Sequence, residues 1–438
     1  MLYSLIERYI KSLQKHSPGY VSALTSGYVL MLSNILIQFV LVPFYIKYLG
    51  QHQFGLLMML MSMLNFAAIG ITWMSGGLIR IMGERWANHD AQGFRDAFIV
   101  GKYVFTFYAI IVVVIGVLLW FAANKLDITN EQVSFSVALA GLYFILLYEN
   151  NTERQAFVGA NIQTIGNSIE VLRIIGFALL SWILVPIVKD VSAVWLAMIA
   201  GIILQRILTG IFWYRKINNI GWGNITHDMK PIFQRLVGRQ GAGYISYGVF
   251  LLILQADTMI VGFLGGADMA GKFVLLWKIP ESIGLLLWKI PSTMEPRAIQ
   301  LDASGENNKL YSIFKTGRNW YFILVLIVSL SYILFGKWLT EIWVGDYAPD
   351  HDWMYIVAGF SLFFNAFARW PISFAYALIK LRPLTMIISA EVVSKLLLTV
   401  VLFGAYNIAA PLLASVITHI LFAAYFYQRL IRKENYIS

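Results

Sequence analysis

The sequence predicts an all-α polytopic membrane protein, and three observations support this. Hydrophobic residues make up 59% of the 438-residue chain, charged residues only 13%, and the mean hydropathy is +0.70. Soluble domains carry roughly 25% charged residues, so a soluble enzyme, a disordered chain, a coiled coil and collagen are excluded. The apolar residues also fall into long runs, and about 20 consecutive apolar residues suffice for a helix to cross a bilayer.

About twelve such runs follow one another, each a predicted transmembrane helix. Glycine and proline within them do not exclude a helix, because neighbouring helices satisfy the freed backbone groups. The predicted spans are residues 21–46, 54–79, 98–123, 133–150, 162–187, 192–213, 241–264, 270–294, 319–343, 353–376, 384–405 and 408–428.

The orientation follows from the basic residues. The N-terminal segment and every second connection after it hold most of the 33 lysine and arginine residues, which predicts cytoplasmic termini. This asymmetry accounts for the net charge of +10 without nucleic acid and predicts contact with anionic lipid. Residues 1–20 repeat apolar residues at helical spacing and predict an amphipathic interfacial helix, with an unstructured basic tail as the alternative.

An internal repeat predicts two six-helix lobes. Gly50 and Gly55, in residues 48–55, correspond to Gly266 and Gly271, in residues 263–271, at one offset near half the chain length. Such a duplication predicts lobes related by a parallel pseudo-two-fold axis, with a central cavity. The predicted domains are the interfacial segment 1–20, an N-terminal lobe 21–213, a cytoplasmic linker 214–240 and a C-terminal lobe 241–438.

The second copy of the repeat is close to a nucleotide-binding motif but departs from it. Residues 266–273 end in Phe273, where the Walker A pattern needs a magnesium-binding serine or threonine, and they follow an apolar helix. We interpret them as a tight helix–helix turn. The chain has no cysteine and no metal-ligand motif, so we expect no metal, no cofactor and no catalytic residue.

Three segments resemble the polysaccharide flippases of the multidrug/oligosaccharidyl-lipid/polysaccharide exporter superfamily, which include O-antigen flippases. They are residues 41–50 (Leu-Val-Pro-Phe-Tyr-Ile-Lys-Tyr-Leu-Gly), 154–157 (Arg-Gln-Ala-Phe) and 254–262 (Leu-Gln-Ala-Asp-Thr-Met-Ile-Val-Gly). The resemblance covers the whole length in span count and half-repeat. It implies alternating access between two lobes in a bacterial inner membrane.

The resemblance also implies a cargo and partners. The cargo would be an undecaprenyl-diphosphate-linked oligosaccharide, moved from the cytoplasmic to the periplasmic leaflet for O-antigen, capsule or exopolysaccharide synthesis. A polysaccharide polymerase and glycosyltransferases would be its protein partners. The alternative within the same superfamily is a cation-coupled multidrug exporter. A membrane enzyme acting through Asp346, Asp350 or Asp352 is a third hypothesis, but these acidic residues lie in a short outer loop that is better explained as solvated.

Ionisable residues inside the spans are candidate functional residues because each is costly to bury in lipid. Helical spacing pairs Glu170 with Arg173, Lys278 with Glu281, and Glu391 with Lys395. These pairs have either a structural or a functional role. The residues left without a local partner sum to a net positive charge, which favours an anionic headgroup over cationic drugs. They are Arg206, Asp257, Lys289 and Arg369.

The eighth span carries Leu-Leu-Trp-Lys-Ile-Pro twice, at residues 275–280 and 286–291. Eleven residues are close to three helical turns, so Lys278 and Lys289 fall on nearly the same face, which we predict to line the cavity. The predicted diphosphate-binding cations are Lys278, Lys289, Arg173, Arg206, Arg369 and Lys395.

Three tryptophans are candidates for stacking on sugar rings, with interfacial or packing roles as the alternative. They are Trp277, Trp288 and Trp370. The candidate coupling or charge-pair carboxylates are Asp257, Glu281, Glu170 and Glu391. For Asp257 the sequence leaves open a cavity cation, a proton or a sodium ion as the partner.

Overall fold

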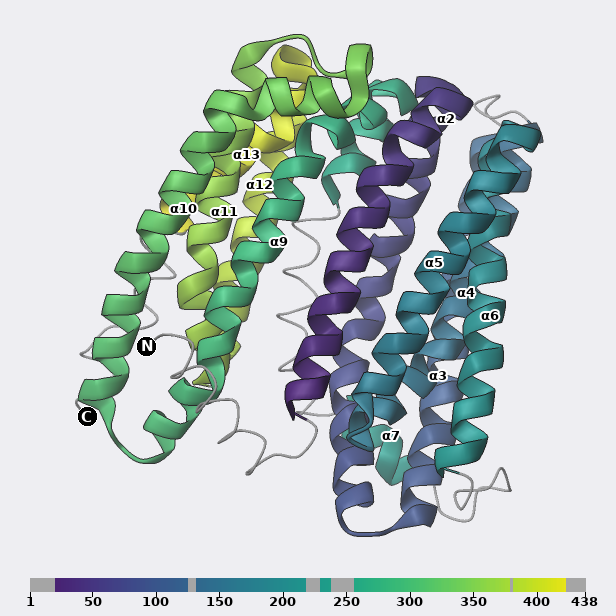
Figure 1. The fold of residues 1–438 in the computed structure, drawn as a ribbon, viewed down its shortest axis with the longest axis vertical. Helices are drawn as coiled ribbons and strands as arrows, with labels where there is room; N and C mark the ends of the chain where they lie inside the picture. Colours follow the sequence, from purple (N-terminus) through teal and green to yellow (C-terminus); the bar gives the residue numbers. More distant parts are fainter. Residues whose placement is uncertain (1–19, 125–130, 218–228, 238–255, 379–380, 423–438) are drawn as a thin grey trace. The chain divides into compact units, whose positions relative to one another are not determined.

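The computed structural model describes residues 20–124, 131–217, 229–237, 256–378 and 381–422 (Figure 1). These residues are 95% helical and contain no strand, which confirms the all-α prediction. The predicted interfacial segment 1–20 lies outside them apart from Tyr20, as does most of the linker.

The chain divides into two compact units, which confirms a two-lobe fold. The first holds residues 1–49 and 70–244, and the second holds residues 50–69 and 245–438. Sequence order had placed residues 50–69 in the first lobe, but their contacts group them with the second unit.

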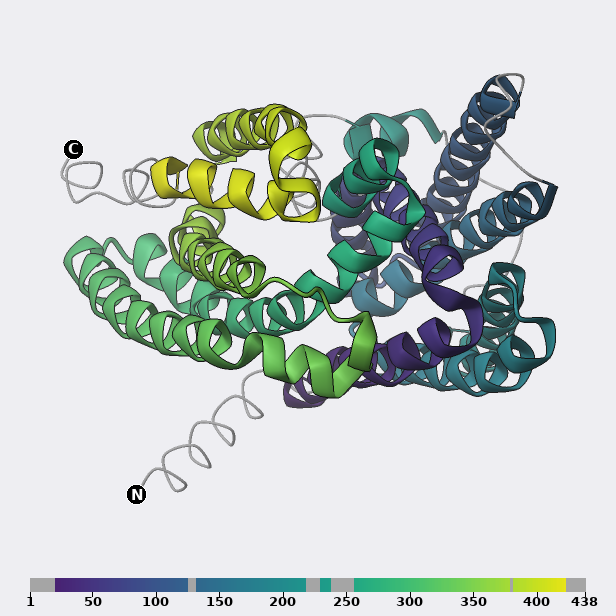
Figure 2. The same ribbon diagram turned by 90° about the horizontal axis from the view of Figure 1, so that it is seen from above.

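Helix α2 (Tyr20–Ala87) contributes to both units. The remaining helices of the first unit are α3 (Ala91–Asn124), α4 (Glu131–Gly159), α5 (Gln163–Val188), α6 (Val191–Ile217) and α7 (Met229–Val237). The second unit contains a short helix Ala256–Gly265, α9 (Ala267–Ala303), α10 (Asn307–Val344), the 3-10 turn η1 (Gly345–Tyr347), α11 (Asp352–Ala377), α12 (Leu381–Tyr406), the 3-10 turn η2 (Asn407–Ala409) and α13 (Ala410–Leu421). Within each unit the long helices pack side by side (Figures 1 and 2).

Within the residues that the structure describes, six helical stretches are long and apolar enough to cross a membrane, so the chain is a multi-pass membrane protein. They are Thr25–Ala68, Ala91–Leu118, Gln163–Val188, Val191–Trp213, Asn307–Tyr347 and Pro383–Leu421. The first and last of these each include parts of two predicted spans. Three other predicted spans are also helical, in α4, α9 and α11.

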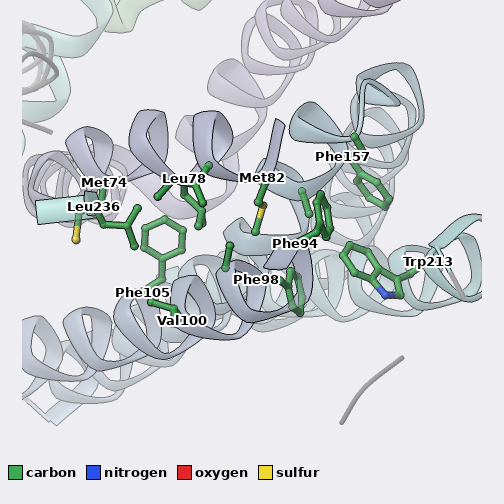
Figure 3. Packing of buried hydrophobic residues seen from close by; sticks show 14 of the residues in the cluster. Met74, Leu78, Met82, Phe94, Phe98, Val100, Phe105, Phe157, Trp213 and Leu236 are labelled. Atoms are coloured by element: carbon green, nitrogen blue, oxygen red, sulfur yellow. The ribbon is translucent and has the colours of Figure 1, made fainter. Parts of the chain in front are cut away.

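The core of the first unit is an apolar cluster at one end of the bundle (Figure 3). The Trp213 ring of α6 packs against Phe98 of α3 and Phe157 of α4, with ring centroids 4.7 and 5.9 Å away. Helix α7 belongs to the same cluster, because Leu236 is 1% exposed there. Arg235 of α7 also donates a 2.5 Å hydrogen bond to Glu84 of α2. The predicted linker therefore includes a helix that is docked on the first unit.

The internal repeat is visible in the backbone. Gly50 interrupts α2 with φ 77° and ψ 167°, and Gly266 precedes α9 with φ 86° and ψ 173°. Both lie in a region of conformational space that favours glycine. The second pair of repeat glycines meets within the second unit, where a Cβ on Gly271 would lie 3.3 Å from the Cα of Gly55. Gly266 alone is the turn between the short helix Ala256–Gly265 and α9, and residues 267–273 form the first turns of α9, so the predicted helix–helix turn is shorter than expected.

This close crossing gives a first prediction. A Cβ on Gly55 would lie 1.7 Å from the backbone oxygen of Ala267, so Gly55→Ala forces the two backbones apart. We expect a loss of about 1–3 kcal/mol, seen as a lower melting temperature of the purified protein in detergent. Gly404→Ala on α12 is the control, because its Cβ meets open space and the change should be neutral or slightly stabilising. Equal melting temperatures for the two variants would refute the crossing.

Candidate functional site

Four buried ionisable residues form two close pairs in the second unit. The Lys395 Nζ donates to Asp257 Oδ2 at 2.7 Å, and His419 Nδ1 lies 3.2 Å from Glu391 Oε1. All four residues are at most 4% exposed. Glu391 and Lys395 lie one turn apart on α12, Asp257 is near the start of Ala256–Gly265, and His419 is on α13. The cluster therefore ties three helical elements together.

This arrangement differs from the predicted pairing. Helical spacing had paired Lys395 with Glu391 and left Asp257 without a local partner. In the structure Lys395 donates to Asp257, 138 positions away in the sequence. Burying two charges is tolerated when the geometry is good, and neither ion would be tolerated there alone. Spacing along one helix cannot reveal such a partner, because it contains no information on which helices are neighbours.

Arg369 and the three candidate tryptophans also lie in the second unit. The Arg369 guanidinium carbon lies 3.4 Å from the centroid of the Trp288 ring, a cation–π contact in which Arg369 is 9% exposed. Trp370 is 3% exposed, and its Nε1 donates to the Phe314 backbone oxygen at 3.0 Å. Trp277 is half-buried. The ring face of Trp288 and the ring nitrogen of Trp370 are therefore in contact with other residues of the protein, at positions that we had proposed for sugar binding.

The repeated hexapeptide yields two lysines in different settings. Lys278 donates to Glu281 at 2.9 Å, as the spacing predicts, and is partly buried. Lys289 is exposed, and its charge acts on Glu295. Lys278 is thus in direct contact with a carboxylate.

The first unit contains a second set of partly buried pairs. Arg173 donates to Glu170 at 2.5 Å on α5, as predicted, and Gln205 of α6 donates to the other oxygen of Glu170 at 2.8 Å. Arg206 donates to Glu149 of α4 at 2.5 Å. Arg206, which had no partner along its own helix, is therefore neutralised across the bundle.

Sequence reasoning missed three charged residues of this set. Lys102 of α3 donates to Glu153 at 2.8 Å and lies 3.7 Å from Glu149. Both carboxylates fall in a polar stretch that we had assigned to the end of a span and the following connection. Helix α4 continues through this stretch to Gly159 and places both on one face. Their i,i+4 spacing was a signal that this stretch is helical.

Ion pairs compensate many of the charges in these sets. In the first unit three cations face three carboxylates: Lys102, Arg173 and Arg206 with Glu149, Glu153 and Glu170. In the second unit Lys278 pairs with Glu281 and Lys395 with Asp257, whereas Arg369 stacks on Trp288. These pairs reduce the positive surplus expected from the sequence.

A metal centre has no evident ligand set in the part of the chain that the structure describes. No three histidine, aspartate or glutamate side chains gather there in a way that would hold an ion. The buried carboxylates Asp257 and Glu391 instead face Lys395 and His419.

Solved structures share this fold. An inward-facing multidrug resistance MATE family transporter of the MOP superfamily matches with a TM-score of 0.71 and 11% identity, covering 94% of this chain and 99% of that one. A MATE protein in complex with MaD3S matches at 0.64 and 13% over 95% and 96%. The Vibrio cholerae MATE transporter VcmN in its bent form matches at 0.58 and 13% over 96% and 99%. No protein-family model and no curated protein sequence matches the chain.

These neighbours give the chain a MATE-like fold of two lobes. They also correct the functional prediction. The inward-facing neighbour is a multidrug resistance transporter, which contradicts the prediction of an undecaprenyl-diphosphate-linked oligosaccharide flippase and favours the alternative, a multidrug exporter. The physical reason for the error is the assumed positive surplus, which the interhelical pairs of Arg206 and Lys395 reduce.

The buried pair Asp257–Lys395 gives a second prediction. Lys395→Met leaves the Asp257 carboxylate buried beside an apolar side chain, and such a loss costs about 3–5 kcal/mol. We expect a clear fall in the melting temperature in detergent. The double variant Asp257→Leu with Lys395→Met removes both charges and should recover most of the loss. A double variant as unstable as the single one would contradict the pairing.

Proposed function

We propose that the chain is a multidrug exporter that moves organic cations out of the cell in exchange for an inorganic cation. The observation that carries the proposal is the pairing of charges in the buried sets. A site for a diphosphate needs uncompensated positive charge, whereas here Arg173, Arg206, Lys278 and Lys395 each form an ion pair with a carboxylate. The MATE neighbours, described as multidrug transporters, support the same substrate class.

The buried carboxylates support coupling to a cation. Glu170 in the first unit and Asp257 and Glu391 in the second are each at most 9% exposed and lie in predicted spans. Ionisable groups within a membrane protein are typical of ion and proton pathways. A group beside these carboxylates whose charge changes when a cation binds would link the two movements.

The proposal includes a setting for the transport cycle. The lobes 21–213 and 241–438 would alternate access, with the segment 214–240 connecting them on the cytoplasmic side. The asymmetry of lysine and arginine supports cytoplasmic termini and a plasma-membrane location, with anionic lipid around the basic connections. The chain would bind and move its substrate without chemical change, as transporters of this fold do.

A direct test is efflux from bacteria that lack their own major exporters. Cells expressing the chain should accumulate less ethidium and fewer other organic cations of unrelated structure. Asp257→Asn should reduce the efflux rate at least about tenfold, because a buried ionisable residue in a span is expected to be essential. Gly404→Ala, on an open face of α12, should leave efflux intact and serves as the matched control. Unchanged accumulation of every organic cation tested would disprove the proposal.

A further inference from the structure

His419 is the only one of the chain's six histidines that falls inside a predicted span. Its side chain is 2% exposed, in the middle of the buried cluster of the second unit. An imidazole is the side chain whose charge changes most readily near neutral pH. A buried imidazole beside charged groups is therefore a candidate for carrying a proton.

The hydrogen bonds of His419 define which ring nitrogen is available. Nδ1 lies 2.9 Å from the Ser415 backbone oxygen, which can only accept, so Nδ1 carries the hydrogen. Glu391 Oε1 is 3.2 Å from the same nitrogen but out of line for a hydrogen bond. In the neutral ring the lone pair is thus on Nε2. An added proton binds there and makes the ring a cation beside Glu391.

His419 is the residue of this cluster whose charge can change near neutral pH. Helix α13 packs against α12, α11 and η2. The charged residues that act on the ring are Glu391 and Lys395 of α12 and Arg369 of α11, whereas η2 contributes no titratable group. Asp257 faces Lys395. Two carboxylates and two cations therefore cancel when the ring is neutral, and one proton brings the cluster to +1.

We propose that the coupling cation of this exporter is a proton and that His419 carries it on Nε2. This inference rests on the proposed export function. A proton leaves external water, binds the Nε2 lone pair, and is released from the same nitrogen to the cytoplasm after the substrate has left. The 2% exposure means that the ring exchanges its proton only when the unit rearranges, as coupled transport requires.

The geometry favours a proton over sodium. A sodium ion in a membrane protein needs several oxygen ligands, usually with unwound backbone carbonyls. The Asp257 carboxylate already holds the Lys395 ammonium at 2.7 Å, and α12 and α13 are continuous helices around Glu391 and His419. A proton needs only the one lone pair that His419 provides.

The test uses the full chain reconstituted in liposomes with ethidium as the substrate. Export should follow an imposed proton gradient and not a sodium gradient. His419→Gln should reduce proton-driven export at least tenfold while ethidium binding persists. His351→Gln, at an exposed histidine, is the matched control. Glu391→Gln removes the facing carboxylate, so the pH midpoint of export should move roughly one unit lower, a change that a purely structural role would not produce.

A titration of His419 that does not depend on export separates the proposal of a proton-carrying histidine from the proposal of an exporter. In NMR spectra of histidine-labelled protein in detergent, one of the histidine resonances that titrate should be absent from the His419→Gln variant. Sodium-driven export, full activity of His419→Gln, or a His419 ring that stays neutral from pH 9 to pH 5 would each overturn the inference. Absence of export under either gradient would refute the exporter proposal itself, and the titration would then decide on His419 alone.

Discussion

Neutralisation of charge inside the helix bundles is the constraint on which the rest of this structure depends. A lysine or carboxylate cannot remain ionised in an apolar bundle unless an opposite charge lies within a few ångströms. Lys395 and Asp257 meet this condition at 2.7 Å, with 2% and 4% of each residue exposed. Because the two residues come from different helices, the pair also determines how α12 packs against Ala256–Gly265. The same requirement links α3, α4 and α6 through Lys102, Glu149 and Arg206.

This constraint changes what the charged residues indicate about function. Read helix by helix, the spans contain an excess of positive charge and favour an anionic substrate. When neighbouring helices are considered together, Arg206 and Lys395 are paired with carboxylates, and the distinctive feature becomes a set of buried carboxylates and one histidine. The proposed exchange of an organic cation for a proton rests on this feature. His419 fits this view because it is the group in its cluster whose charge can change without leaving a carboxylate uncompensated.

The glycine repeat shows a second constraint, which concerns the backbone alone. Gly50 and Gly266 adopt nearly the same positive φ, and Gly55 and Gly271 let two helices cross at backbone contact. Small residues permit such close approach between helices in a membrane protein. His52 and Asp268, 216 positions apart like the glycine pairs, also lie 3.4 Å from each other beside this crossing. Equivalent positions of the two repeats thus meet within one unit.

Features that depend on local residue order could be predicted from the amino-acid sequence. Apolar runs defined the helices because length and composition suffice to recognise a span, and spacing of three residues identified the pairs Glu170–Arg173 and Lys278–Glu281. The glycine offset revealed the duplication. The partners of Lys395 and Arg206 could be identified only in the folded protein. The same is true of the contact between Arg369 and Trp288 and of the grouping of residues 50–69 with the second unit. These features depend on which helices are neighbours. Long side chains reach from one helix to another, and the spacing of residues along a single helix carries no information about such contacts.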